Sequence, residues 1–75
     1  MTQYEPNAVA LDSMGHPARL FTYSPCFTKE QCYKVIKNWS DGHGYKLLCS
    51  WIEVEHDSGA KRIIAHKTYR ENFFG

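Results

Sequence analysis

Residues 28–40 read "TKEQCYKVIKNWS", and this run predicts an amphipathic helix. Thr28, followed three residues later by Gln31, matches the capping box, in which the two side chains bond free amides of the first turn. Apolar side chains then recur at the spacing of one helix face, at Cys32, Val35, Ile36 and Trp39. A glycine at position 42 or 44 can supply the left-handed residue that ends many helices.

Two predicted hairpins flank this helix. After it, residues 45–56 and 61–69 are rich in β-branched and aromatic residues and surround the turn "DSG" at 57–59. Before it, residues 8–11 and 18–23 form a weaker pair around "DSMGHP". The order is therefore ββαββ. We expect a small two-layer α+β fold, with one helix on one face of an antiparallel sheet of three or four strands.

The two hairpins resemble each other in sequence. The first runs "VALDSMGHPARLFTY" and the second "VEHDSGAKRIIAHKTY". Each has Asp-Ser before a Gly, then an Arg, two apolar residues and Thr-Tyr. Either an internal duplication or two turns of similar chemistry between similar strands would produce this likeness.

Length and composition bound what the chain can be. Its 75 residues make one domain, residues 1–75, with a small core. A content of 43% hydrophobic and 23% charged residues is typical of a folded protein, and the net charge of +1 provides no long-range field for a polyanion. No apolar run is long enough to span a bilayer, and the N-terminus lacks the pattern of a secretion signal. Three cysteines suit a reducing compartment, so we expect a cytoplasmic protein.

The sequence predicts no metal, no cofactor and no enzymatic activity. Cys26 and Cys32 have five residues between them, whereas structural zinc sites usually have two to four. Cys32 lies on the apolar stripe and is expected in the core; Cys26, near the start of the helix, could be either packed or reactive. No nucleophile, phosphate-binding or dinucleotide motif occurs, and the histidines have no ligand spacing. These histidines are His16, His43, His56 and His66.

A candidate interaction surface is indicated by "LLCSWI", residues 47–52. Strand alternation puts Leu47, Cys49 and Trp51 on one side and apolar residues on the other side as well. One helix covers only one face of a sheet. The other face has to be covered by the chain's own ends, through Phe73 or Phe74, by a second copy, or by a partner.

A two-residue turn at 58–59 puts Trp51 directly opposite His66. The predicted partner-binding residues are then Leu47, Cys49, Trp51, Ile64, His66 and Arg70. An aromatic centre with a charged rim is typical of protein interfaces. We therefore expect a non-catalytic interaction or regulatory module, in a homodimer or with another protein and away from membranes. Its size would suit an accessory protein of a phage or mobile element.

Nucleic-acid binding is the alternative function. Sheets that interleave basic and aromatic side chains bind single strands. The last predicted strand and its end carry such residues at Lys61, Arg62, Lys67, Tyr69 and Arg70. Against this reading, Glu53, Glu55 and Asp57 lie on the neighbouring strand or turn, and Glu55 would pair with Arg62 across the hairpin.

Overall fold

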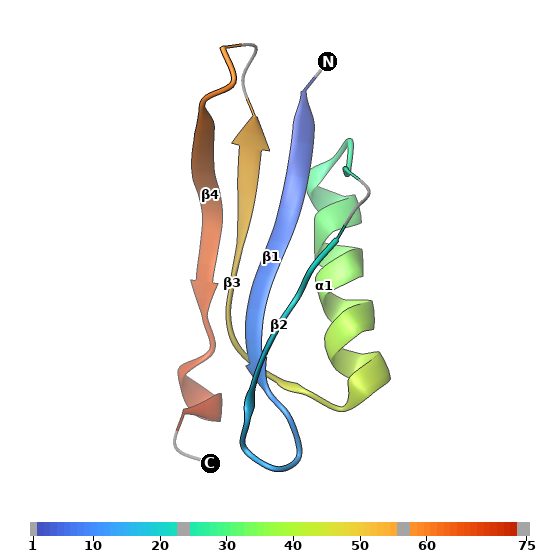
Figure 1. Ribbon diagram of the computed structural model, residues 1–75, viewed down its shortest axis with the longest axis vertical. Helices are drawn as coiled ribbons and strands as arrows, with labels where there is room; N and C mark the ends of the chain where they lie inside the picture. The colour runs from blue at the N-terminus through green and yellow to red at the C-terminus, as the bar shows by residue number, and fades with distance from the viewer. Residues whose placement is uncertain (1, 23–24, 56–57, 74–75) are drawn as a thin grey trace.

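The computed structural model describes residues 2–22, 25–55 and 58–73, and it contains one helix packed on a four-stranded antiparallel sheet (Figure 1). The elements in chain order are β1 (Gln3–Leu11), β2 (Pro17–Arg19), α1 (Lys29–His43), β3 (Lys46–Glu55), β4 (Lys61–Thr68) and the short 3-10 helix η1 (Arg70–Asn72). The sheet order is β2-β1-β3-β4, so each hairpin places its first strand at the centre and its second at an edge. The predicted α+β fold and ββαββ order are confirmed.

Helix α1 begins where its sequence predicts and extends past the predicted end. Thr28 is the N-cap, and its hydroxyl accepts a hydrogen bond from the Gln31 amide at 3.1 Å. The Gln31 side chain accepts from the amide of Phe27 at 2.7 Å, one residue before the amide that a capping box uses. Gly44 is the left-handed C-cap, so the helix continues to His43, beyond the predicted end at residue 40. In the described part of the chain, no helix has the length and apolarity to cross a bilayer.

Strand β1 begins at Gln3, well before the predicted start at residue 8, and it is a central strand although it contains Pro6. Tyr4 exchanges both backbone bonds with Cys26, at 2.8 and 2.9 Å, and the carbonyl of Ala8 accepts from the chain that follows β2. Alternate residues of a strand direct their backbone groups to the same side. Pro6 therefore faces away from β3, and its missing amide removes no bond from the β1–β3 ladder.

The predicted ends of several strands lie outside the described residues or differ from the ends observed. Strand β2 is a three-residue edge strand that stops at Arg19, and the predicted end at Tyr23 is outside the described residues. Strand β3 ends at Glu55; the predicted end at His56 and the turn residue Asp57 are also outside them. The two edges of the sheet are therefore unequal, since β4 is a full strand.

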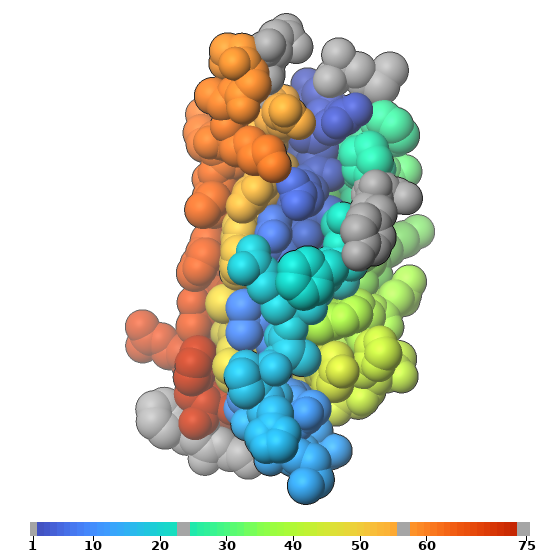
Figure 2. All heavy atoms as spheres, viewed as in Figure 1, coloured from blue at the N-terminus to red at the C-terminus, as the bar shows by residue number. Residues whose placement is uncertain are grey.

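The core lies between α1 and the central strands β1 and β3, which α1 contacts. Figure 2 shows α1 (green) and β4 (orange) at opposite sides of the view, with the other strands between them. One buried group contains Ala8, Leu20 and Ile36, and a second contains Cys26, Cys32 and Ile52. The prediction that Cys32 packs in the core is confirmed, and Cys26 is buried beside it. Burial, together with a hydrogen bond with the Cys26 thiol, raises the pKa of Cys32 to about 12.

Two irregularities shift the strand registers. The first, between β1 and β3, follows Val9, and beyond it Leu47 packs against the core group of Ala8. The second, between β3 and β4, falls between Ser50 and Ile52. Close to it, Ala65 adopts a left-handed backbone with φ 51°, which is uncommon for a residue with a side chain. A bulge of this kind places two residues opposite one and cannot be read from alternation alone.

The register expected from a two-residue turn holds on only one side of the second bulge. Cys49 pairs with Thr68, in agreement with that register. Nearer the turn, Glu55 pairs with Lys61, so its expected pairing with Arg62 is wrong. Ile64, expected on the face away from the helix, pairs instead with a core residue of β3 and packs in the core.

Candidate interaction surface

The sheet face that points away from α1 carries the candidate site, and we call it the open face. Ala8 and Ile52 are buried on the helix side of the sheet. Because side chains alternate along a strand, the residues directly before and after them point to the open face. The registers then give its members: Gln3, Glu5, Asn7, Val9 and Leu11 of β1; Pro17 and Arg19 of β2; Lys46, Cys49, Trp51, Glu53 and Glu55 of β3; Lys61, Ile63 and Thr68 of β4.

Trp51 lies at the centre of the open face, where an arginine from β2 reaches it. The guanidinium carbon of Arg19 is 5.8 Å from the centroid of the Trp51 ring and 5.9 Å from that of Phe21. Cations at this distance are attracted to the faces of aromatic rings. Asn7, which pairs with Trp51, is only 5% exposed and donates to the Glu5 carbonyl at 3.2 Å. The centre of the open face is therefore closely packed.

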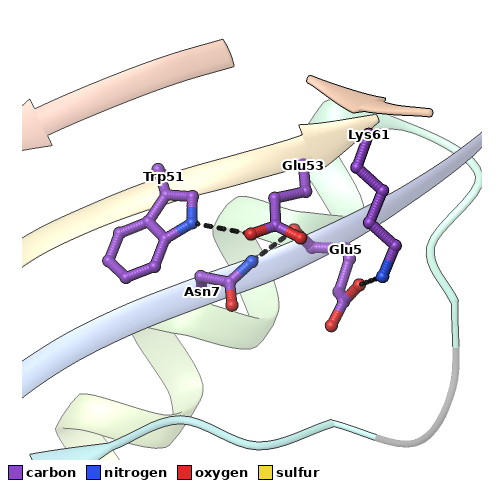
Figure 3. A network of polar contacts seen from close by, with 5 residues as sticks. All are labelled: Glu5, Asn7, Trp51, Glu53 and Lys61. Atoms are coloured by element: carbon purple, nitrogen blue, oxygen red, sulfur yellow. Dashed lines mark hydrogen bonds and ion pairs between the residues drawn. The ribbon is translucent and has the colours of Figure 1, made fainter. Parts of the chain in front are cut away.

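Polar contacts extend from Trp51 toward the end of β3. The indole Nε1 donates to Glu53 Oε1 at 3.3 Å, and Lys61 Nζ lies 3.4 Å from Glu5 Oε2. Figure 3 shows these side chains on the same side of the strands, with the helix behind the sheet. The hydrogen bond to Glu5, and then the charges of Glu5, Glu53 and Glu55, raise the pKa of Lys61. The ammonium of Lys61 is therefore paired with Glu5, and the charges of Glu53 and Glu55 also favour its protonated form.

One end of the open face is acidic and hollowed. A hollow of about 220 Å³ is lined by Gln3, Tyr4, Glu5, Thr22, Pro25, Glu53, Glu55 and Lys61. Its three carboxylates outnumber its one ammonium, whereas the cation Arg19 lies on the other side of Trp51. Among the described residues, no group of three or more His, Cys, Asp or Glu side chains could hold a metal ion.

The structure brings together part of the predicted partner-binding set. Cys49 and Trp51 lie on the open face. Leu47 and Ile64 pack in the core, so their assignment to this surface is wrong, and the two bulges are the reason. The expected one-to-one pairing of Trp51 with His66 is also wrong, because the register shifts at this point.

The residues of the nucleic-acid alternative are divided between the two sides of the sheet. Lys61 lies on the open face, whereas Arg62 and Lys67 pair with buried, helix-facing residues of β3. Lys67 Nζ also lies 4.7 Å from the centroid of the Tyr69 ring. Arg70 is in η1 rather than in β4, so it is not part of the strand. These basic residues do not form one continuous strip.

As far as Phe73, the C-terminal segment contacts the start of β3. Asn72 Nδ2 donates to the Leu47 carbonyl at 2.6 Å, and the Tyr69 amide donates to the Leu48 carbonyl at 2.9 Å. Phe73 is 51% exposed, and Phe74 is outside the described residues. Trp51 is contacted instead by Arg19 and Glu53.

Arg19 is among the members of this surface that sequence reasoning missed. The sequence predicts the hairpin that contains Arg19, and it shows that Arg19 lies two residues before the aromatic Phe21. However, Arg19 reaches Trp51 only because β1 pairs with β3, and the whole of α1 separates those two strands in the chain. No local pattern indicates that pairing.

Comparisons of this chain with protein-family models, with curated proteins and with solved structures found no match. The geometry of the open face is therefore the basis for a functional proposal.

Proposed function

We propose that this protein is a small non-catalytic interaction module that binds another protein through the open face. The observation that carries the proposal is the composition of that face. Trp51 and Arg19 lie in contact near its centre, and Ile63 is 59% exposed. Phe21, whose ring lies against Arg19 beside this face, is 74% exposed. Tryptophan and arginine are enriched among the residues that dominate binding energy at protein interfaces.

Nucleic-acid binding is the competing proposal, and the charges support it less. Glu5, Glu53 and Glu55 share the open face with Trp51, so a strand stacked on that ring would bring its phosphates toward carboxylates. Lys61 is already paired with Glu5. Binding to a polyanion depends on unpaired cations that displace its counterions. A protein partner fits this mixed, partly apolar face better.

We also propose that the protein acts in the cytoplasm. Its three cysteines, Cys26, Cys32 and Cys49, are all free thiols. Thiols persist in this state in reducing compartments. Oxidised cysteines in protein isolated rapidly from cells under thiol-trapping conditions would contradict this location.

The function is tested with Trp51→Glu and with Tyr33→Glu as a matched control. Tyr33 is an aromatic residue of α1, 49% exposed and on the other side of the sheet. Wild type and both variants are immobilised, incubated with an extract of the source cells, and compared by quantitative mass spectrometry of the retained proteins. We expect a protein partner that wild type and Tyr33→Glu retain and Trp51→Glu loses, while circular dichroism shows all three folded.

Phe21→Glu is a second test that does not depend on Trp51, because Phe21 is mostly exposed. It should weaken retention of the same partner. Equal retention by all variants would overturn the proposal. Binding of a single-stranded oligonucleotide with a Kd below about a micromolar at physiological salt, lost on Arg62→Glu with Lys67→Glu, would favour the nucleic-acid function instead.

A further inference from the structure

We infer that the partner of the open face is a second copy of this chain, packed face to face and turned end for end. The inference rests on the proposed function and adds the identity and orientation of the partner. In this arrangement a twofold axis lies across the strands, between the two sheets, level with the pair Asn7 and Trp51. The same surface is then used by both copies, as in most homodimers.

The charges of the open face are self-complementary in this orientation. Arg19 pairs with Val9, which is two residues along β1 from Asn7. Glu5 and Glu53 pair with each other, two residues from Asn7 in the opposite direction. Turning the second copy end for end therefore places each Arg19 over the carboxylate end of its partner.

Strand dimensions bring Arg19 within reach of the partner's Glu5. Two residues of a strand span about 6.6 Å, so the two groups lie equally far from the axis along the strands. Strand β2 is next to β1, and adjacent strands are about 4.8 Å apart, a sideways distance that an arginine side chain covers. Stacked sheets lie about 10 Å apart, which two long side chains can bridge.

The Arg19 guanidinium still has donors to offer. It lies over the Phe21 and Trp51 rings, and within the described residues it takes part in no ion pair. A guanidinium directs its N–H groups outward in its own plane, so contact with a ring leaves donors at its edge for a carboxylate. The Glu5 side chain is 45% exposed and can accept them.

The apolar part of the open face also favours a second copy over a highly charged partner. Phe21 and Ile63 are exposed, and Val9 and Trp51 are half-buried. The cores of homodimer interfaces are more apolar than the rest of a protein surface. In the proposed arrangement the two Trp51 rings approach each other near the axis, so each copy removes apolar surface of the other from water.

The inference is tested by exchanging the two charges in separate chains, Arg19→Glu and Glu5→Arg. Self-association is measured by analytical ultracentrifugation over a concentration series. Either variant alone has like charges at both symmetry-related contacts, so we expect dimerisation to weaken by about tenfold or more. An equal mixture has opposite charges at both contacts. We therefore expect association to return, as a dimer with one chain of each variant.

Lys37→Glu and Glu30→Arg make the same charge changes on the exposed side of α1, and we expect them to leave dimerisation unchanged. A wild-type chain that stays monomeric throughout the series overturns the inference. So does a dimer that the open-face variants do not weaken, or a mixture that fails to associate. If the chain is monomeric but Trp51→Glu still abolishes retention of a different protein, the proposed function stands and only the second copy is excluded.

Discussion

Asp12 organises the turn that joins β1 to β2. Its Oδ1 accepts hydrogen bonds from the amides of Met14 and His16, each at 2.8 Å. The Asp12 amide in turn donates to the His16 carbonyl at 2.9 Å. A side chain that bonds backbone amides two and four residues on closes a tight turn without a longer loop. This single residue therefore helps to place Arg19 on the open face.

We expect Asp12→Ala to destabilise the protein in a pH-dependent way. Backbone hydrogen bonds, that of His16 first, lower the pKa of Asp12 from its usual 3.8. A carboxylate with a lowered pKa stabilises the folded state fully above its unfolded pKa, and this contribution is lost as the pH falls through the folded pKa. The difference in free energy of unfolding between wild type and variant, from urea titrations, should therefore be largest near neutral pH and shrink below about pH 4.

Asp12→Asn is the control for that experiment, because it keeps an acceptor oxygen at the turn and removes the charge. Its difference from wild type should also shrink in acid, and it should be smaller than that of Asp12→Ala near neutral pH. A penalty for Asp12→Ala that is constant from pH 7 to about pH 2 would show that ionisation of this carboxyl does not contribute.

At the scale of elements, the end of α1 contains two glycines in different backbone conformations. Gly42 lies inside the helix, where an added Cβ would meet no atom within 4 Å. Gly44 is the C-cap with φ 70°, a conformation that residues with a side chain rarely adopt. Only one of the two glycines is therefore required by the backbone.

We expect Gly42→Ala to raise the free energy of unfolding and Gly44→Ala to lower it, each by about 1 kcal/mol. Alanine inside the helix reduces the entropy lost on folding, whereas alanine at the cap is strained. The substitutions are chemically identical and two residues apart, so each controls for the other in urea unfolding. Effects of the same sign would contradict the assignment of Gly44 as the residue that ends the helix.

The helix could be predicted from its sequence, but most of β1 and the faces of β3 could not. Helix caps and apolar periodicity depend on residues within one or two turns of each other. Pro6 and Asn7 belong to types that are depleted in strands, and they are accommodated in β1 only because of the chain that runs beside it. Leu47 was assigned to the wrong face because a bulge interrupts the alternation.

At the scale of the whole molecule, β3 is the strand with a full partner on each side. It pairs with β1 along one side and with β4 along the other. Strand β2 is short, and β4 has its outer side unpaired within the sheet. The most stable backbone bonds are therefore expected in β3 and in the part of β1 that contacts it.

Hydrogen exchange followed residue by residue measures this distribution. We expect the slowest amides in β3, fast exchange in β2, and an alternation of slow and fast amides in β4, because only every second amide of an edge strand bonds its neighbour. Uniformly slow amides along β4 would contradict the sheet order for the isolated chain. They would indicate that another strand covers this edge.

Interactions between residues close in the chain were enough to predict α1, its caps and the ββαββ order. These features depend on backbone preferences and on apolar spacing, which the sequence contains locally. The antiparallel pairing of β1 with β3, the two bulges and the contact of Arg19 with Trp51 depended on long-range packing. Contacts between distant segments are selected by how the whole core closes, because each must offset the entropy of bringing those segments together.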